Sequence, residues 1–124
     1  MKKQDLPLSP HLQIYKPQIT SLLSISHRIS GVALNFVLVI LVLGLLCITL
    51  GESYFELLIS LINSFPIKII IFLAILGFSY HFLNGIRHII WDFGFLLGNR
   101  SSAIFGYIII ATSFISSVFI SRLL

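Results

Sequence analysis

Three long runs without Asp, Glu, Lys or Arg constrain this chain more than any other feature of its sequence. They extend from Ile29 to Leu50, from Ile69 to Ile86 and from Ser101 to Ser121. About 20 apolar residues in an α-helix cross a hydrocarbon layer about 30 Å thick, and a soluble helix would need a polar face that these runs lack. We therefore predict an all-α integral membrane protein with three transmembrane helices, over about residues 24–50, 64–92 and 101–123.

The composition agrees with a membrane location. Hydrophobic residues make up 57% of the chain and charged residues 10%, whereas soluble domains carry about 25% charged residues. The formal net charge is +4, but the cations lie beside the apolar runs and form no basic patch interleaved with aromatic residues. We therefore expect a lipid bilayer around this chain and no nucleic acid as a partner.

The charges that flank the runs predict the orientation of the chain. Cations precede the first run and separate the second from the third, at Lys2, Lys3, Lys16, Arg28, Arg87 and Arg100. The loop expected between the first two helices carries Glu52 and Glu56, and Lys68 lies only near its end. The positive-inside rule then places the N-terminus and the second connection on the cytoplasmic side, which in a mitochondrion is the matrix side.

The first 20 residues precede a single transmembrane domain over residues 21–124. They contain Pro7, Pro10 and Pro17, so they cannot form one long helix. We expect this segment to lie along the membrane surface or against a partner protein. No apolar segment follows Lys2 and Lys3 in the way that a signal peptide requires, so no cleavable leader is expected.

Polar residues at helical spacing mark the cytoplasmic ends of the first two predicted helices. They are Ser24, His27, Arg28, Gly31 and Asn35 in the first helix, and His81, Asn84, Gly85 and His88 in the second. Spacings of three, four and seven residues place each set along one stripe of its helix. An unpaired polar group in hydrocarbon is unfavourable by on the order of several kcal/mol, so the two stripes indicate a functional site.

His81 is the deepest titratable side chain of this set. A neutral imidazole can bind a metal through one nitrogen and donate a hydrogen bond from the other. Gly77 and Gly85, one turn on either side, leave room for a flat macrocycle or for a closely packed helix. The pattern fits haem ligation, an interhelical hydrogen bond, or a proton relay or transport role. A six-coordinate b-type haem usually needs two axial ligands, so haem would require a second subunit or a second copy.

The two arginines near these stripes allow two interpretations. Arg28 and Arg87 either anchor their helices at the membrane interface or join His27 and His88 in a cluster that binds anionic groups. Asp92 is the only carboxylate nearby in the sequence. Haem propionates would supply further negative charge.

Three blocks of the sequence resemble one known family. They are Leu6–Tyr15, Ser24–Gly31 with the pattern SxSHRxSG, and His81–Asp92 with the pattern HxxNGxRHxxWD. In their order, spacing and placement they resemble the cytochrome b556 subunits of succinate dehydrogenase, the succinate:quinone oxidoreductase of respiratory complex II. The likeness covers nearly the whole chain, although the third predicted helix matches only as a generic apolar helix.

The resemblance implies a role in electron transport from succinate to ubiquinone. The chain and a second small membrane subunit would form a heterodimeric haem-binding helix bundle that anchors a flavoprotein subunit and an iron–sulfur subunit. His81 matches the axial ligand of haem b from this subunit, and the second membrane subunit would supply the other ligand. Ser24 and Arg28 match positions that line the quinone pocket. His27, Arg28 and His88 match positions near the haem propionates.

Other functions remain open from the sequence. The chain could be the haem-bearing anchor of a fumarate reductase or of another quinone oxidoreductase. It could also be a small membrane assembly or transport subunit without haem, although transporters typically have broken helices and a polar midplane lined by several spans. We expect the inner (cytoplasmic) membrane of a bacterium or, alternatively, the mitochondrial inner membrane. No succinate site is expected in this subunit alone.

Overall fold

The computed structural model describes residues 16–123, and within them it contains four α-helices and no strand. The helices are α1 (Ile19–Thr49), α2 (Glu52–Asn63), α3 (Phe65–Asp92) and α4 (Asn99–Ser121). Most of the predicted surface segment lies outside the described residues. Its last two residues belong to α1, which begins earlier than the expected start of the first span.

Three of these helices, α1, α3 and α4, are long and apolar enough to cross a membrane. This finding confirms the predicted all-α fold with three transmembrane helices. The helices contain 31, 28 and 23 residues. At about 1.5 Å per residue, even α4 is longer than a hydrocarbon layer of about 30 Å requires. Helices longer than the hydrocarbon layer tilt or extend their terminal turns to the level of the lipid headgroups.

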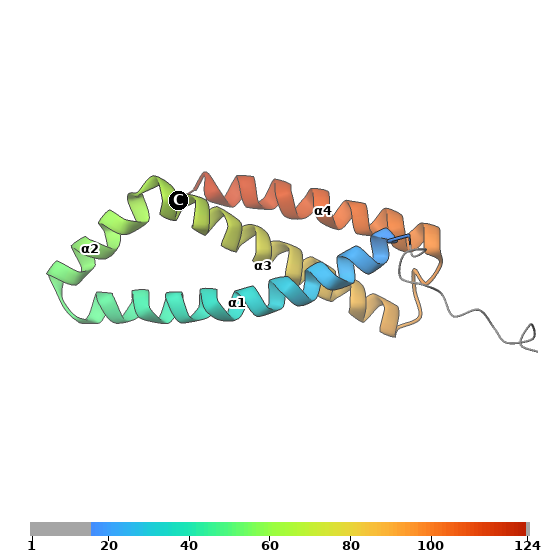
Figure 1. Cartoon of the computed structure of the whole chain (residues 1–124), viewed down its shortest axis with the longest axis horizontal. Coiled ribbons are helices and arrows are strands. Elements are labelled where there is room, and N and C mark those ends of the chain that lie inside the picture. The colour runs from blue at the N-terminus through green and yellow to red at the C-terminus, as the bar shows by residue number, and fades with distance from the viewer. Residues whose placement is uncertain (1–15, 124) are drawn as a thin grey trace, which may run out of the picture.

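The connection between α1 and α3 is itself helical, although the sequence suggested only a loop there. Gly51 separates α1 from α2 and has a φ of 115°, a conformation that favours glycine. Ser64 separates α2 from α3, and its hydroxyl donates to the Leu61 carbonyl at 2.6 Å. Because both connections are short, α2 stays in contact with α1 and α3 (Figure 1).

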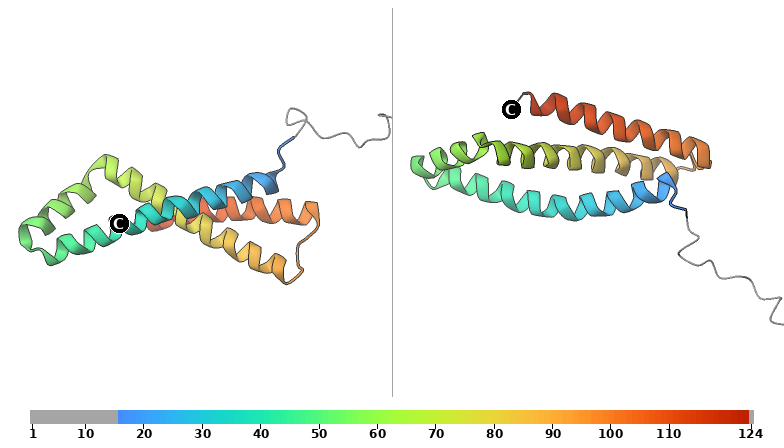
Figure 2. Two further views of the ribbon diagram at one scale, coloured as in Figure 1. Left: turned by 60° about the horizontal axis from the view of Figure 1, so that its bottom comes forward. Right: turned by 45° about the horizontal axis from the view of Figure 1, so that its top comes forward.

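The helix α3 lies between α1 and α4 and packs on both of them (Figure 2). α1 crosses α3 obliquely, and Gly31 of α1 meets the His81 ring of α3 at this crossing. The starts of α1 and α4 lie beside the end of α3, and we call this part of the bundle the histidine end. The ends of α1 and α4, the start of α3 and all of α2 lie opposite, and we call that part the α2 end.

Four of the five residues on the packing face of α4 are small. Its buried positions are Ser102, Gly106, Ile109, Ser113 and Ser117. These residues recur every three or four positions and therefore share one face of the helix. The hydroxyls of Ser113 and Ser117 donate to carbonyls of their own helix, at 2.7 and 2.6 Å, so they are satisfied without a partner from α3. Small side chains allow close helix packing in a membrane, which gives the serines of the otherwise featureless third span a physical role.

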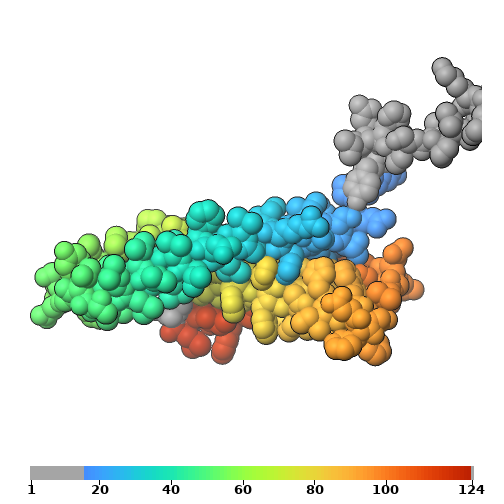
Figure 3. Space-filling view, turned by 90° about the horizontal axis from the view of Figure 1, so that it is seen from below, coloured from blue at the N-terminus to red at the C-terminus, as the bar shows by residue number. Residues whose placement is uncertain are grey.

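Most large apolar side chains point away from the bundle. Among the described residues, only Leu23 and Ile109 are buried hydrophobic residues. α1 exposes apolar side chains along nearly its whole length and, in Figure 3, shares one face of the molecule with the end of α3. An exposed apolar surface of this extent indicates contact with lipid or with partner helices.

Candidate functional site

The side chains of His27 and His81 form a reciprocal pair where α1 crosses α3. His27 Nε2 lies 3.2 Å from the carbonyl oxygen of His81, and His81 Nδ1 lies 3.1 Å from the carbonyl oxygen of His27. The two rings stack with their centroids 4.0 Å apart and their planes 4° from parallel. The structure therefore shows the interhelical hydrogen bond that the sequence allowed for His81, and it adds a second bond in the opposite direction.

The partners of His81 determine which of its ring nitrogens carries the proton. A backbone carbonyl can only accept, so the short contact with the His27 carbonyl requires a proton on His81 Nδ1. Ser30 completes this arrangement, because its hydroxyl donates to the same carbonyl at 2.9 Å and its oxygen lies 3.1 Å from His81 Nδ1. In the neutral ring, Nε2 then keeps its lone pair, which is the form of histidine that binds a metal.

Glycines make the close approach of the two helices possible. A β-carbon at Gly31 would lie 2.9 Å from His81 Cε1, nearer than an unstrained contact permits. A β-carbon at Gly85 would lie 3.7 Å from His27 Nε2, which is ordinary contact. A β-carbon at Gly77 would meet nothing within 4 Å among the described residues, so the turn before His81 borders open space. The absence of a side chain at Gly31 thus lets the His81 ring lie close to α1, and the absence of one at Gly77 leaves open space one turn before His81.

His88 extends the histidine pair along α3. Its ring centroid lies 5.2 Å from that of His27, with the two planes tilted by 47°. His88 also meets Trp91 in an edge-to-face arrangement, at a centroid distance of 5.1 Å and an interplanar angle of 88°. The structure therefore brings three of the predicted site residues, His27, His81 and His88, into one cluster.

Arg87 does not join this cluster, because it faces α4. Its guanidinium donates to the carbonyl and the hydroxyl oxygen of Ser102, at 3.0 and 2.8 Å, and to Asn84 Oδ1 at 3.3 Å. It also lies over the ring of Trp91, with Cζ 4.2 Å from the ring centroid. Only 1% of Arg87 is exposed. Arg87 is thus a buried link between α3 and α4, which differs from both roles that the sequence allowed, an interfacial anchor and a member of a cluster with His27 and His88.

Three buried donor atoms of α3 lack a partner among the described residues: Asn84 Nδ2, Arg87 Nε and Trp91 Nε1. They lie at positions separated by three and four residues, so they belong to one face of α3. Asn84 is fully buried on this face, and Arg87 nearly so. The face that carries Arg87 is therefore polar and tightly enclosed, in contrast to the more open face that carries His81.

Ser24 and Arg28 lie on α1 within one turn of His27, but their side chains are not part of the histidine cluster. Arg28 is exposed and Ser24 is half-buried, and neither makes a hydrogen bond to another side chain or backbone group in residues 16–123. Arg28 borders a shallow hollow of about 440 Å³, together with apolar residues of the same helix. Those residues are Ile29, Val32, Ala33 and Phe36. A hollow lined by one helix only is open on its other side, so a second protein or lipid must close it.

Three further polar residues belong to this region, although the sequence pattern did not single them out. Ser30 contacts the His81 ring, Ser102 accepts from Arg87, and the Tyr80 hydroxyl donates to the Leu23 carbonyl at 2.7 Å. Ser30 was detectable in principle, because it follows His27 by three residues and so shares its helix face. Tyr80 and Ser102 gave no comparable signal, because their partners lie on other helices.

The fold and the site together define a class of protein. This chain is a small membrane protein of three transmembrane helices, with a histidine cluster at one end of the bundle and an apolar surface suited to lipid and partner helices. Over residues 2–120 it matches the family described as "Succinate dehydrogenase/Fumarate reductase transmembrane subunit", and it belongs to that family.

Individual relatives agree with this family. The chain is 44% identical over 107 residues to the succinate dehydrogenase cytochrome b556 subunit of Rickettsia typhi, a match that covers 86% of this chain and 83% of the relative. It is 45% identical over 101 residues to the succinate dehydrogenase cytochrome b560 subunit of Marchantia polymorpha, covering 77% of this chain and 73% of the relative. The match with the cytochrome b560 subunit of Chondrus crispus is 44% over 104 residues and covers 77% and 78%.

Proposed function

We propose that this chain is a haem-bearing membrane anchor of a succinate:quinone oxidoreductase. In this proposal it provides His81 as one axial ligand of haem b, and it contributes Ser24 and Arg28 to a ubiquinone site. A second small membrane subunit supplies the other axial ligand, and a flavoprotein subunit and an iron–sulfur subunit carry out succinate oxidation. The family and the names of the relatives support this assignment.

The observation that carries the haem proposal is the contact of His81 Nδ1 with the His27 carbonyl oxygen at 3.1 Å. This nitrogen donates to the His27 carbonyl, so Nε2 is the nitrogen available to iron. The glycines at positions 31 and 77 also fit a bulky planar ligand. Gly31 lets the His81 ring lie close to α1, and Gly77 leaves open space one turn before His81. When bound, haem b supplies a one-electron redox centre. In this proposal His27 and His88 lie near the propionates. The ring of His27 stacks on that of His81 and also contacts the ring of His88.

The quinone proposal depends on groups that are not already engaged. The Ser24 hydroxyl can donate to a quinone carbonyl. The Arg28 guanidinium remains charged and can stabilise the negative charge that develops when the quinone is reduced. Arg28 borders the open hollow and Ser24 lies one turn before it on α1, so the partner subunits would complete the pocket.

The proposed orientation places the histidine end on the cytoplasmic side of a bacterial inner membrane, or on the matrix side of a mitochondrial one. Lys16, Arg28, Arg87 and Arg100 lie at this end, whereas at the α2 end Lys68 and Arg122 are offset by Glu52 and Glu56. This distribution follows the positive-inside rule. It also directs the quinone residues toward the side on which the soluble subunits would dock. The family description includes fumarate reductase, so the same site could serve the reverse reaction in a related enzyme.

The visible spectrum of the purified membrane complex tests the haem proposal. We expect b-type absorption bands in the reduced complex and their loss in His81→Ala, with succinate oxidation by an artificial acceptor retained. Added imidazole should restore part of the band, because it can occupy the space of the missing ring and bind the iron. A colourless complex with all partner subunits present, or a full band in His81→Ala, would contradict the proposal.

A further inference from the structure

We infer that Tyr80 is a positioning residue of the proposed quinone site, which it serves by fixing the turn of α1 that carries Ser24. This inference rests on the proposed function. Tyr80 lies on α3, and its hydroxyl donates to the carbonyl oxygen of Leu23 at 2.7 Å. That carbonyl belongs to the peptide bond that joins Leu23 to Ser24. The hydroxyl thus acts on the backbone immediately before one of the two proposed quinone residues.

The side chain of Leu23 gives this turn a second attachment. Leu23 is only 3% exposed, and it packs against Gly106 of α4 so closely that a β-carbon there would overlap with Leu23 Cδ1. The Leu23 backbone is held by α3 and its side chain by α4. Ser24 and Arg28 make no hydrogen bonds of their own within the described residues, so their positions depend on how this turn of the backbone is held.

Tyr80 and His81 act on α1 in the same way. Tyr80 donates to the carbonyl of Leu23, and His81, the next residue, donates to the carbonyl of His27. These two carbonyls are four residues apart and therefore lie one above the other on α1. Two neighbouring residues of α3 thus fix two consecutive turns of α1. One turn carries Ser24, and the other leads into the Ser30 and Gly31 contacts with the His81 ring.

The substitution Tyr80→Phe removes only the hydroxyl and leaves the ring in place. In the purified complex we expect the KM for ubiquinone to rise about fivefold, the effect of one hydrogen bond of ordinary net strength. The b-type bands and the rate with an artificial acceptor should not change. Tyr107→Phe is the matched control, because Tyr107 is 59% exposed and its substitution should leave the KM for ubiquinone as it is.

A double-mutant cycle with Ser24→Ala separates this inference from the proposed function. If Tyr80 acts through Ser24, the two substitutions together should raise the KM by less than the product of their separate effects. A raised KM in Ser24→Ala with an unchanged KM in Tyr80→Phe would overturn the positioning role alone. An unchanged KM in Ser24→Ala would overturn the proposed quinone role of Ser24 and this inference with it. A uniform loss of b-type bands and of both activities in Tyr80→Phe would also overturn it, in favour of a role in folding.

Discussion

The two ends of this bundle differ in how their polar groups are used. At the histidine end, side chains of α3 bond to both neighbouring helices, His81 to α1 and Arg87 to α4. At the α2 end, the side-chain hydroxyls of Thr49, Ser64 and Ser121 donate to backbone carbonyls three residues away in the chain. Polar residues therefore link helices at the histidine end, whereas these three hydroxyls at the α2 end are satisfied locally.

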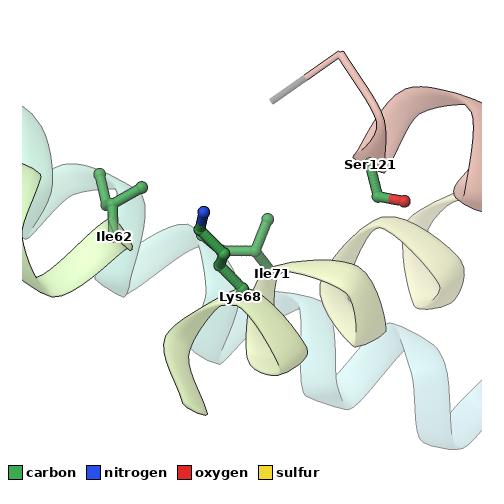
Figure 4. Close-up of a pocket in the computed structure, with 4 residues that line it drawn as sticks. All are labelled: Ile62, Lys68, Ile71 and Ser121. Atoms are coloured by element: carbon green, nitrogen blue, oxygen red, sulfur yellow. The ribbon is translucent and has the colours of Figure 1, made fainter. Parts of the chain in front are cut away.

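The hollows at the two ends also differ, in the residues that line them and in what lies beside them. At the α2 end a hollow of about 100 Å³ lies between three helices, lined by Ile62, Lys68, Ile71 and Ser121 (Figure 4). Lys68 is the one titratable residue in this lining. The open hollow at the histidine end borders Arg28, and the neighbouring residue His27 belongs to the histidine cluster. The contrast teaches that polar contacts between helices are concentrated where the helices cross.

We expect the replacement of Arg87, at the histidine end, to cause the largest loss of stability. Arg87→Leu leaves the Ser102 and Asn84 acceptors buried without their donor, so we expect a loss of about 3 kcal/mol in the free energy of unfolding. Thermal unfolding of the purified complex measures this loss. Arg100→Gln, at an exposed position in the first turn of α4, is the control and should change stability by less than about 0.5 kcal/mol.

The opposite result for Arg87 would also be informative. A buried charge without a carboxylate partner loses its hydration, and well-packed apolar replacements sometimes stabilise such sites. If Arg87→Leu raised the unfolding temperature, the desolvation of the guanidinium would outweigh its hydrogen bonds to Ser102. The link between α3 and α4 would then depend on the small residues of α4 instead.

Substitutions at two glycines of α1 allow the two ends to be compared within one helix. Gly31→Ala should destabilise the complex by about 1–2 kcal/mol and weaken the b-type bands, because its β-carbon would displace the His81 ring. Gly44→Ala should be neutral or stabilising by about 0.5 kcal/mol, since the nearest atom, Leu58 Cδ1, lies 3.9 Å from the new β-carbon. Thermal unfolding and visible spectra measure both variants. Equal effects of the two substitutions would contradict the difference between the ends.

A substitution in the α2-end hollow should have the smallest effect. Lys68→Gln removes an exposed cation, so we expect a change in stability of less than about 0.5 kcal/mol, with the b-type bands and the KM for ubiquinone unaltered. Quinone kinetics and spectra of the purified complex check this expectation. A changed KM would show that the α2 end is coupled to the histidine end through α3.

Part of the site followed from the sequence because it depends on the position of residues around a single helix. Successive residues of an α-helix are rotated by about 100°, so a spacing of seven returns nearly to the same face. His88 therefore shares a face of α3 with His81, and both rings meet His27. Arg28 is rotated by about 100° from His27, and the stripe predicted on α1 allowed either residue to face α3. The structure selects His27, because its ring is the one that stacks on His81.

The contacts between helices could not be predicted in this way. Arg87 lies about 120° around α3 from His81, which places it on a different face, but the sequence does not say which helix that face meets. The partner proved to be Ser102 of α4. The hydrogen bond from Tyr80 to Leu23 likewise depends on how α1 crosses α3. Helix α2 was not predicted, because its 12 residues are too few to span a membrane and were expected to form the loop between two spans.

The sequence by itself determined the three membrane helices and the accumulation of polar residues near one end, because hydropathy and helical periodicity are local properties of the chain. Only the tertiary structure decided the partners of each polar side chain. His81 donates to the His27 carbonyl of α1, whereas Arg87 is enclosed against α4. The physical reason is that hydrogen bonds between helices depend on crossing position and on the close approach that Gly31 and Gly106 permit, and these follow from packing of the whole bundle.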